Sequence, residues 1–121
     1  MAAIRTFRDL IAWQKGKELC KGVYVLTRRM PEDERFGMTN QMRRAAVSIP
    51  SNLAEGHARQ SRLDFLKFLR TARGSLAELM TQLEIAWELG LLPSDENLSL
   101  LLQEVDRVLQ GLIRSLENKG K

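Results

Sequence analysis

The chain has few of the residues that build most catalytic and metal sites. Its 121 residues include a single cysteine, Cys20, and a single histidine, His57. One cysteine excludes an intrachain disulfide and is typical of a reducing, cytoplasmic compartment. One cysteine with one histidine also cannot supply the ligands of a structural zinc site. We therefore expect no metal, no cofactor and no catalytic residues, and predict that the protein is not an enzyme.

Long apolar runs are also missing. No uninterrupted stretch approaches the roughly 18 residues that a membrane span needs, and charges interrupt the N-terminal residues, unlike a signal peptide. No membrane association is therefore expected. Alternation of apolar and polar residues with a period of two does not persist anywhere, which argues against β-strands. The sequence predicts an all-α fold.

Apolar residues recur at helical spacing in four segments, which we place at residues 7–29, 39–56, 62–89 and 95–117. Pro31 and Gly90 end two of these segments, while Thr39 and Ser61 are candidate N-caps. Short connections between helices favour neighbours that run in opposite directions. The expected architecture is an antiparallel up-down four-helix bundle that forms a single domain over residues 1–121.

Polar residues form a second stripe beside the apolar face of two expected helices. Antiparallel packing of residues 39–56 on residues 62–89 brings these stripes to one level, so we predict an internal polar network centred on an ion pair between Arg44 and Glu78. Gly74 is expected to permit close approach of the two helices. The predicted network comprises Gln41, Arg44, Ser48, Asn52, Glu55, Thr71, Ser75 and Glu78.

Two of these features have catalytic alternatives. Glu55 and Glu78 are a possible carboxylate pair for acid–base chemistry, although an ion pair with Arg44 is the favoured interpretation. Cys20 is a candidate nucleophile, but its place on an apolar face is more typical of a buried structural thiol.

Basic residues are unevenly distributed. Residues 43–73 contain seven Lys/Arg against two acidic residues, whereas residues 74–121 contain four against eight. Positive charge with sufficient reach binds phosphates without reading the base sequence, and the few aromatic residues argue against base stacking. The alternative is that these cations serve solubility or form salt bridges between subunits. The candidate nucleic-acid-binding residues are Arg59, Arg62, Lys67, Arg70 and Arg73.

Three stretches resemble a known family. FRDLIAWQKGKEL, QMRRAAVSIPSNLAEG and FLRTARGSLAELMTQLEIAWELG are similar to the four-helix-bundle proteins encoded within intervening sequences of bacterial 23S ribosomal RNA genes. The residues that match the family pattern are Trp13, Gln41, Arg44, Ser48, Asn52, Ala54, Glu55, Gly56, Gly74, Ser75 and Glu78.

This resemblance implies assembly into a homopentameric ring. The related accessory proteins of diversity-generating retroelements form a similar pentamer, bind nucleic acid and associate with a reverse transcriptase. The unusually wide apolar arc of residues 7–29 also favours contact with another subunit. We therefore expect an oligomeric accessory protein that binds RNA or DNA. The alternative is an interaction scaffold for a separately encoded protein partner, reverse-transcriptase-like or other, without direct nucleic-acid binding.

Overall fold

The computed structural model describes residues 3–120, and over that range it contains helices and turns but no strand. The all-α, four-helix prediction is confirmed. No helix in these residues is long and apolar enough to span a membrane. The elements in chain order are the 3-10 turn η1 (Phe7–Asp9), α1 (Ile11–Thr27), the 3-10 turn η2 (Glu32–Glu34), α2 (Met38–Ala58), α3 (Arg62–Glu88) and α4 (Glu96–Lys119).

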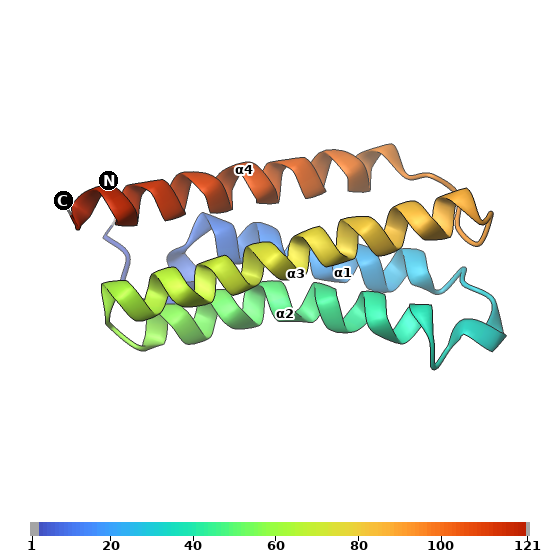
Figure 1. Cartoon of the computed structure of the whole chain (residues 1–121), viewed down its shortest axis with the longest axis horizontal. Coiled ribbons are helices and arrows are strands. Elements are labelled where there is room, and N and C mark those ends of the chain that lie inside the picture. The colour runs from blue at the N-terminus through green and yellow to red at the C-terminus, as the bar shows by residue number, and fades with distance from the viewer. Residues whose placement is uncertain (1–2, 121) are drawn as a thin grey trace.

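The four helices lie lengthwise beside one another, and the chain reverses direction at each connection (Figure 1). Helix α1 packs against α2 and α4, and α3 packs against the same two helices. One end of the structure carries the α1–α2 and α3–α4 connections, whereas the α2–α3 turn lies at the other end (Figure 1).

The helices bury one apolar stripe each, because residues three or four apart share a helix face. Burial of a large apolar side chain contributes about 1.5–3 kcal/mol, so these stripes supply most of the stabilising free energy. The largest fully buried side chains are Leu19, Val23, Met42, Ile49, Leu53, Leu69, Leu76, Leu79, Leu83, Val105 and Leu109.

The first predicted helix is interrupted near its start. Thr6 and Asp9 form a capping box around η1, and Leu10 then adopts an extended backbone conformation before α1 begins at Ile11. The apolar pattern continues through this break, which is why the spacing alone predicted one helix from residue 7.

Helix α2 begins one residue earlier than predicted and uses a different cap. Gly37 is the N-cap, and Thr39 lies inside the first turn without capping it. The helix also continues through Gly56 to Ala58. The N-cap of α3 agrees with the prediction, because the Ser61 hydroxyl accepts a hydrogen bond from the Asp64 amide.

Candidate nucleic-acid interface

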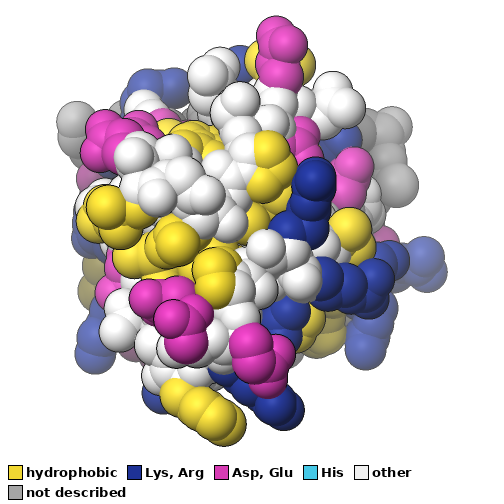
Figure 2. All heavy atoms as spheres, turned by 90° about the vertical axis from the view of Figure 1, so that its right-hand side faces the viewer, with side chains coloured by type: hydrophobic (Ala, Val, Ile, Leu, Met, Phe, Trp, Pro, Cys, Tyr) yellow, Lys and Arg dark blue, Asp and Glu magenta, His cyan; other side chains and the backbone are white. Residues whose placement is uncertain are grey.

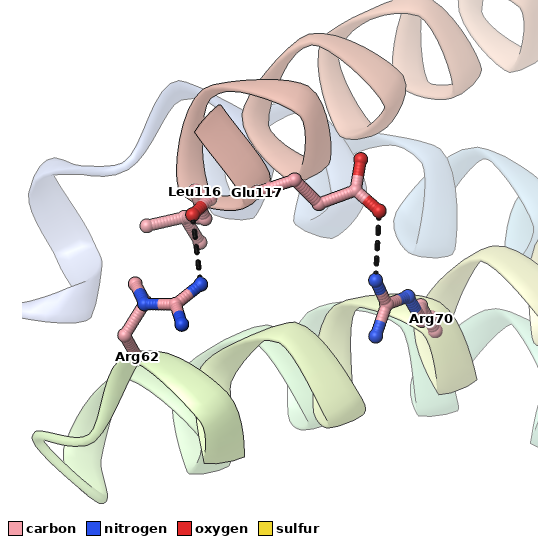
Figure 3. Close-up of polar contacts among 4 residues, drawn as sticks. All are labelled: Arg62, Arg70, Leu116 and Glu117. Atoms are coloured by element: carbon pink, nitrogen blue, oxygen red, sulfur yellow. Dashed lines mark hydrogen bonds and ion pairs between the residues drawn. The ribbon is translucent and has the colours of Figure 1, made fainter. Parts of the chain in front are cut away.

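Three of the predicted nucleic-acid-binding arginines reach across to α4. Arg70 Nη2 lies 2.8 Å from Glu117 Oε2, and Arg62 Nη1 donates a hydrogen bond to the Leu116 carbonyl at 3.0 Å (Figure 3). Arg73 Nε lies 3.3 Å from Asp106 Oδ1. These side chains therefore connect α3 to α4.

The other two predicted residues lie near or on the first half of α3. Arg59 Nη2 is 3.4 Å from Glu55 Oε1, one helical turn earlier. Lys67 is exposed and forms no ion pair with any described residue. Exposed ion pairs contribute little stability, so a phosphate can replace a carboxylate as the partner of a cation. Each such exchange, however, leaves the carboxylate unpaired beside a polyanion that repels it.

A second group of cations has no carboxylate partner. We call it the basic face, and none of its members forms an ion pair within residues 3–120. No acidic residue occurs in residues 19–31 or in residues 35–54. The field over this side of α1 and α2 is therefore positive, and the acidic residue nearest to it in sequence, Glu18, contacts Lys15. The basic face consists of Lys17 and Lys21 of α1, Arg28 directly after the end of α1, and Arg43 and Arg44 of α2.

Aromatic rings in the basic face are already covered by cations. The Arg43 guanidinium lies 4.7 Å from the ring centroid of Tyr24, and Lys17 Nζ lies 4.5 Å from that of Trp13. Stacking on an unpaired base needs an open ring face. This geometry favours contact with phosphates over contact with bases.

A hollow of about 570 Å³ opens on the outer side of α2 within this face. Its lining includes serine and asparagine side chains, and no Asp or Glu lines it. The hydroxyl and amide groups are suited to hydrogen bonds with phosphate oxygens. The hollow is lined by Tyr24, Asn40, Arg43, Arg44, Val47, Ser48, Ser51 and Asn52.

The predicted polar network forms only in its centre. Ser48 Oγ and Ser75 Oγ are 2.8 Å apart and join α2 to α3. The Asn52 side-chain amide donates to both the hydroxyl and the carbonyl of Ser48, each at 2.8 Å. These three side chains are half-buried, so the hydrogen bonds contribute to the α2–α3 contact.

The remaining members of the network are exposed, and the predicted ion pair between Arg44 and Glu78 is not formed among the described residues. Both side chains are exposed. An ion pair open to water contributes little stability, so these two residues gain little from pairing. The exposed members are Gln41, Arg44, Glu55, Thr71 and Glu78.

The predicted role of Gly74 is also wrong. Nothing lies within 4 Å of the position that a Cβ would take there. Close approach of α2 and α3 occurs instead at Gly56, where a Cβ would lie 2.6 Å from Phe68 Cβ.

The catalytic alternatives gain no support from the geometry. Cys20 is half-buried, and burial raises the pKa of its thiol, which disfavours the nucleophilic thiolate. The Glu55 carboxylate contacts Arg59. Among the described residues, no hydrogen bond joins Glu55 to Glu78. Within residues 3–120, no three His, Cys, Asp or Glu side chains gather as a candidate metal site.

The fold and surface define a class of small all-α proteins in which four helices share one apolar core. A family model described as "23S rRNA-intervening sequence protein" matches residues 8–114. The chain belongs to this family. Among curated proteins, no match is found.

Proposed function

We propose that this chain is a non-enzymatic accessory protein that binds nucleic acid without base preference and acts as a homo-oligomer of antiparallel four-helix bundles. The observation that carries the proposal is the basic face, whose cations have no carboxylate partners. Phosphate contacts depend on charge and reach, and no carboxylate has to be displaced before these residues bind.

Oligomerisation rests on the family resemblance, which implies a homopentameric ring, and on exposed apolar side chains. Ile11, Val25 and Leu100 are 61%, 58% and 56% exposed. A ring would place several copies of the basic face on one assembly, and linked weak sites bind with greater total affinity than each alone. Light scattering that gives a 13.8 kDa particle at micromolar concentration would contradict this part of the proposal.

The test compares three variants that each neutralise three cations. The first carries Lys17→Gln, Lys21→Gln and Arg44→Gln in the basic face. The second carries Arg59→Gln, Arg62→Gln and Arg70→Gln from the residues predicted by sequence; glutamine is used because a glutamate at position 70 would face Glu117. The control changes exposed cations of α4 that form no ion pair in the described chain, namely Arg107→Gln, Arg114→Gln and Lys119→Gln.

Binding to duplex RNA and DNA is measured at several salt concentrations on variants that retain the wild-type circular dichroism spectrum and mass. The basic-face variant is expected to bind more weakly to all sequences, and its salt slope should fall by about one unit for each phosphate that a removed cation contacts in the wild type. The control should bind like wild type. Weakening confined to the second variant would place the interface on α3 and remove the basic face from the proposal.

The second candidate function is a protein-interaction scaffold. It is favoured by a hollow of about 640 Å³ between α1 and α4, where the exposed side chains of Val25 and Leu100 stand beside Gly22, Leu98 and Leu101. Apolar hollows with charged rims are typical of surfaces that bind amphipathic helices. Absence of nucleic-acid binding by the wild type at low salt would favour this function.

A further inference from the structure

A small polar hollow lies where the end of α1, the following turn and the first turn of α2 meet. Its volume is about 170 Å³. It opens near the end of the structure seen in Figure 2, where Lys and Arg side chains gather along one side of the surface. The polar and charged residues that line it are Thr27, Arg28, Glu32, Arg35, Thr39 and Arg43.

Thr39 has a buried hydroxyl without a partner. Its side chain is 6% exposed, and its Oγ1 forms no hydrogen bond with any described residue. An unpaired buried polar atom costs about 1–3 kcal/mol, and most such atoms in proteins have a partner. The Thr39 side chain lines the hollow. Because its Oγ1 has almost no accessible surface, the side chain must turn about χ1 before a group bound there can supply the missing partner.

Arg43 contributes a fixed positive charge. The guanidinium Nε donates to Thr27 Oγ1 at 2.9 Å, and Nη2 lies 3.5 Å from the Tyr24 carbonyl. These partners are neutral, and Arg43 is half-buried without a carboxylate in ion-pair contact. A guanidinium has five N–H donors, so donors remain for a ligand in a geometry that is already set.

The other charges around the hollow leave an excess of positive charge. Arg28 has no ion-pair partner among residues 3–120, and Arg35 is paired with Glu32 at 3.5 Å. Outside the lining, Glu34 Oε2 accepts a hydrogen bond from the Met38 amide at 3.2 Å. Three arginines therefore face one acidic residue in the lining.

The first turn of α2 adds a further favourable contribution. Its N-cap is Gly37, which has no side chain to accept hydrogen bonds from the amides of the first turn, and the Glu34 carboxylate accepts from one of them, that of Met38. The partial positive charge at a helix N-terminus favours a bound anion. The helix end, the unpartnered hydroxyl and the arginines thus point to the same kind of ligand.

We propose that this hollow binds the phosphate group of a phosphate monoester, either a free molecule or the phosphorylated end of a nucleic acid. At a liquid-water share of about 30 Å³ per molecule, the hollow has room for one tetrahedral oxyanion and a few waters. Thr39 Oγ1 donates to one phosphate oxygen, and Arg43 and Arg28 supply charge-assisted hydrogen bonds. The site does not depend on the proposed function, because it requires a terminal phosphate and not a nucleic-acid backbone.

The experiment follows backbone amide resonances of the whole chain by NMR during titration with inorganic phosphate, with sodium chloride at matched ionic strength as the reference. Thr39→Val removes the hydroxyl with little change of shape, Arg43→Gln removes the charge, and Arg114→Gln is a charge-matched control on α4. We expect saturable shifts at Thr39 and its neighbours, about tenfold weaker binding in Thr39→Val, at least tenfold weaker binding in Arg43→Gln and wild-type binding in the control.

Thr39→Val also separates this proposal from the proposed function. Without phosphate it is expected to raise the melting temperature, because it removes an unpaired buried hydroxyl, and it should leave the salt slope of duplex binding unchanged. Oligonucleotides with a 5′-phosphate or a 5′-hydroxyl identify the source of the ligand. Tighter binding of the 5′-phosphorylated oligonucleotide than of the 5′-hydroxyl one indicates a nucleic-acid end. Binding of free phosphate as tight as that of the 5′-phosphorylated oligonucleotide indicates a small molecule.

The proposal is overturned if neither phosphate probe produces saturable shifts at Thr39. It is also overturned if Thr39→Val and Arg43→Gln both bind phosphate as wild type does while remaining folded.

Discussion

Substitution of two α-helical glycines by alanine is expected to change stability in opposite directions. At Gly56, a new Cβ would lie 2.6 Å from Phe68 Cβ and 3.2 Å from Phe65 Cδ1. Phe68 Cβ is fixed to the backbone of α3, so relief of the overlap requires the two helices to move apart. At Gly74, a new Cβ meets nothing within 4 Å.

The magnitudes follow from two opposing contributions. Alanine is favoured over glycine inside a helix by about 1 kcal/mol, and Gly74→Ala should gain most of this. Overpacking of a close contact costs about 1–3 kcal/mol, and an overlap at 2.6 Å with Phe68 Cβ belongs at the upper end of that range. Gly56→Ala should therefore lose about 2 kcal/mol after the helix gain is subtracted. For a chain of this size, each kcal/mol changes the melting temperature by about 4 °C.

Thermal and urea unfolding followed by circular dichroism measure both variants, and Gly111→Ala is the matched control because its Cβ position is also open. Each variant is measured at several protein concentrations, since assembly makes the melting temperature depend on concentration. The reasoning is refuted if Gly56→Ala is as stable as wild type. Loss of stability in Gly74→Ala at high concentration alone would instead show that another subunit packs against this surface.

Three further outcomes test individual contacts. Ser75→Ala should cost about 1 kcal/mol, measured by urea unfolding, because Ser48 loses a half-buried hydrogen-bond partner; an unchanged midpoint would contradict this. Cys20 should react with a thiol reagent more slowly than a free cysteine at pH 8, because burial raises its pKa, and reaction at the free rate would refute it. Hydrogen bonds from the backbone amides of Arg5 and Thr6 lower the pKa of the Asp9 carboxyl below its ordinary value of 3.8. Its stabilising contribution is thus complete above pH 3.8 and declines as the pH falls, so Asp9→Asn should flatten an acid unfolding profile below that pH.

The helices could be predicted from sequence because the apolar spacing that defines them is local. Residues such as Leu76, Leu79 and Leu83 share one face whatever the rest of the chain does, and all three are fully buried. The exact ends were less predictable, since Thr39 and Gly37 are both acceptable N-caps and the turn before α2 decides between them.

The polar contacts were less predictable, because residues of one polar stripe differ in exposure and in whether a partner lies within hydrogen-bond distance. Ser48 and Ser75 meet, whereas Arg44, one turn before Ser48, is exposed and forms no ion pair with Glu78 among the described residues. The pairing of Arg70 with Glu117 depends on the packing of α4 on α3. The basic face did leave a signal in the sequence, because residues 19–31 and 35–54 contain no acidic residue. A count of net charge over longer segments does not reveal these two acid-free stretches.

The salt dependence of wild-type binding to duplex DNA tests the central claim most directly. Fluorescence anisotropy with a labelled duplex is measured from low to physiological salt, with two unrelated sequences of equal length. The account predicts equal affinity for both sequences and a linear fall of log K against log[salt], with a slope of about −0.9 for each phosphate contacted by a cation of the basic face. A slope near zero, or no binding at the lowest salt concentration, would contradict it.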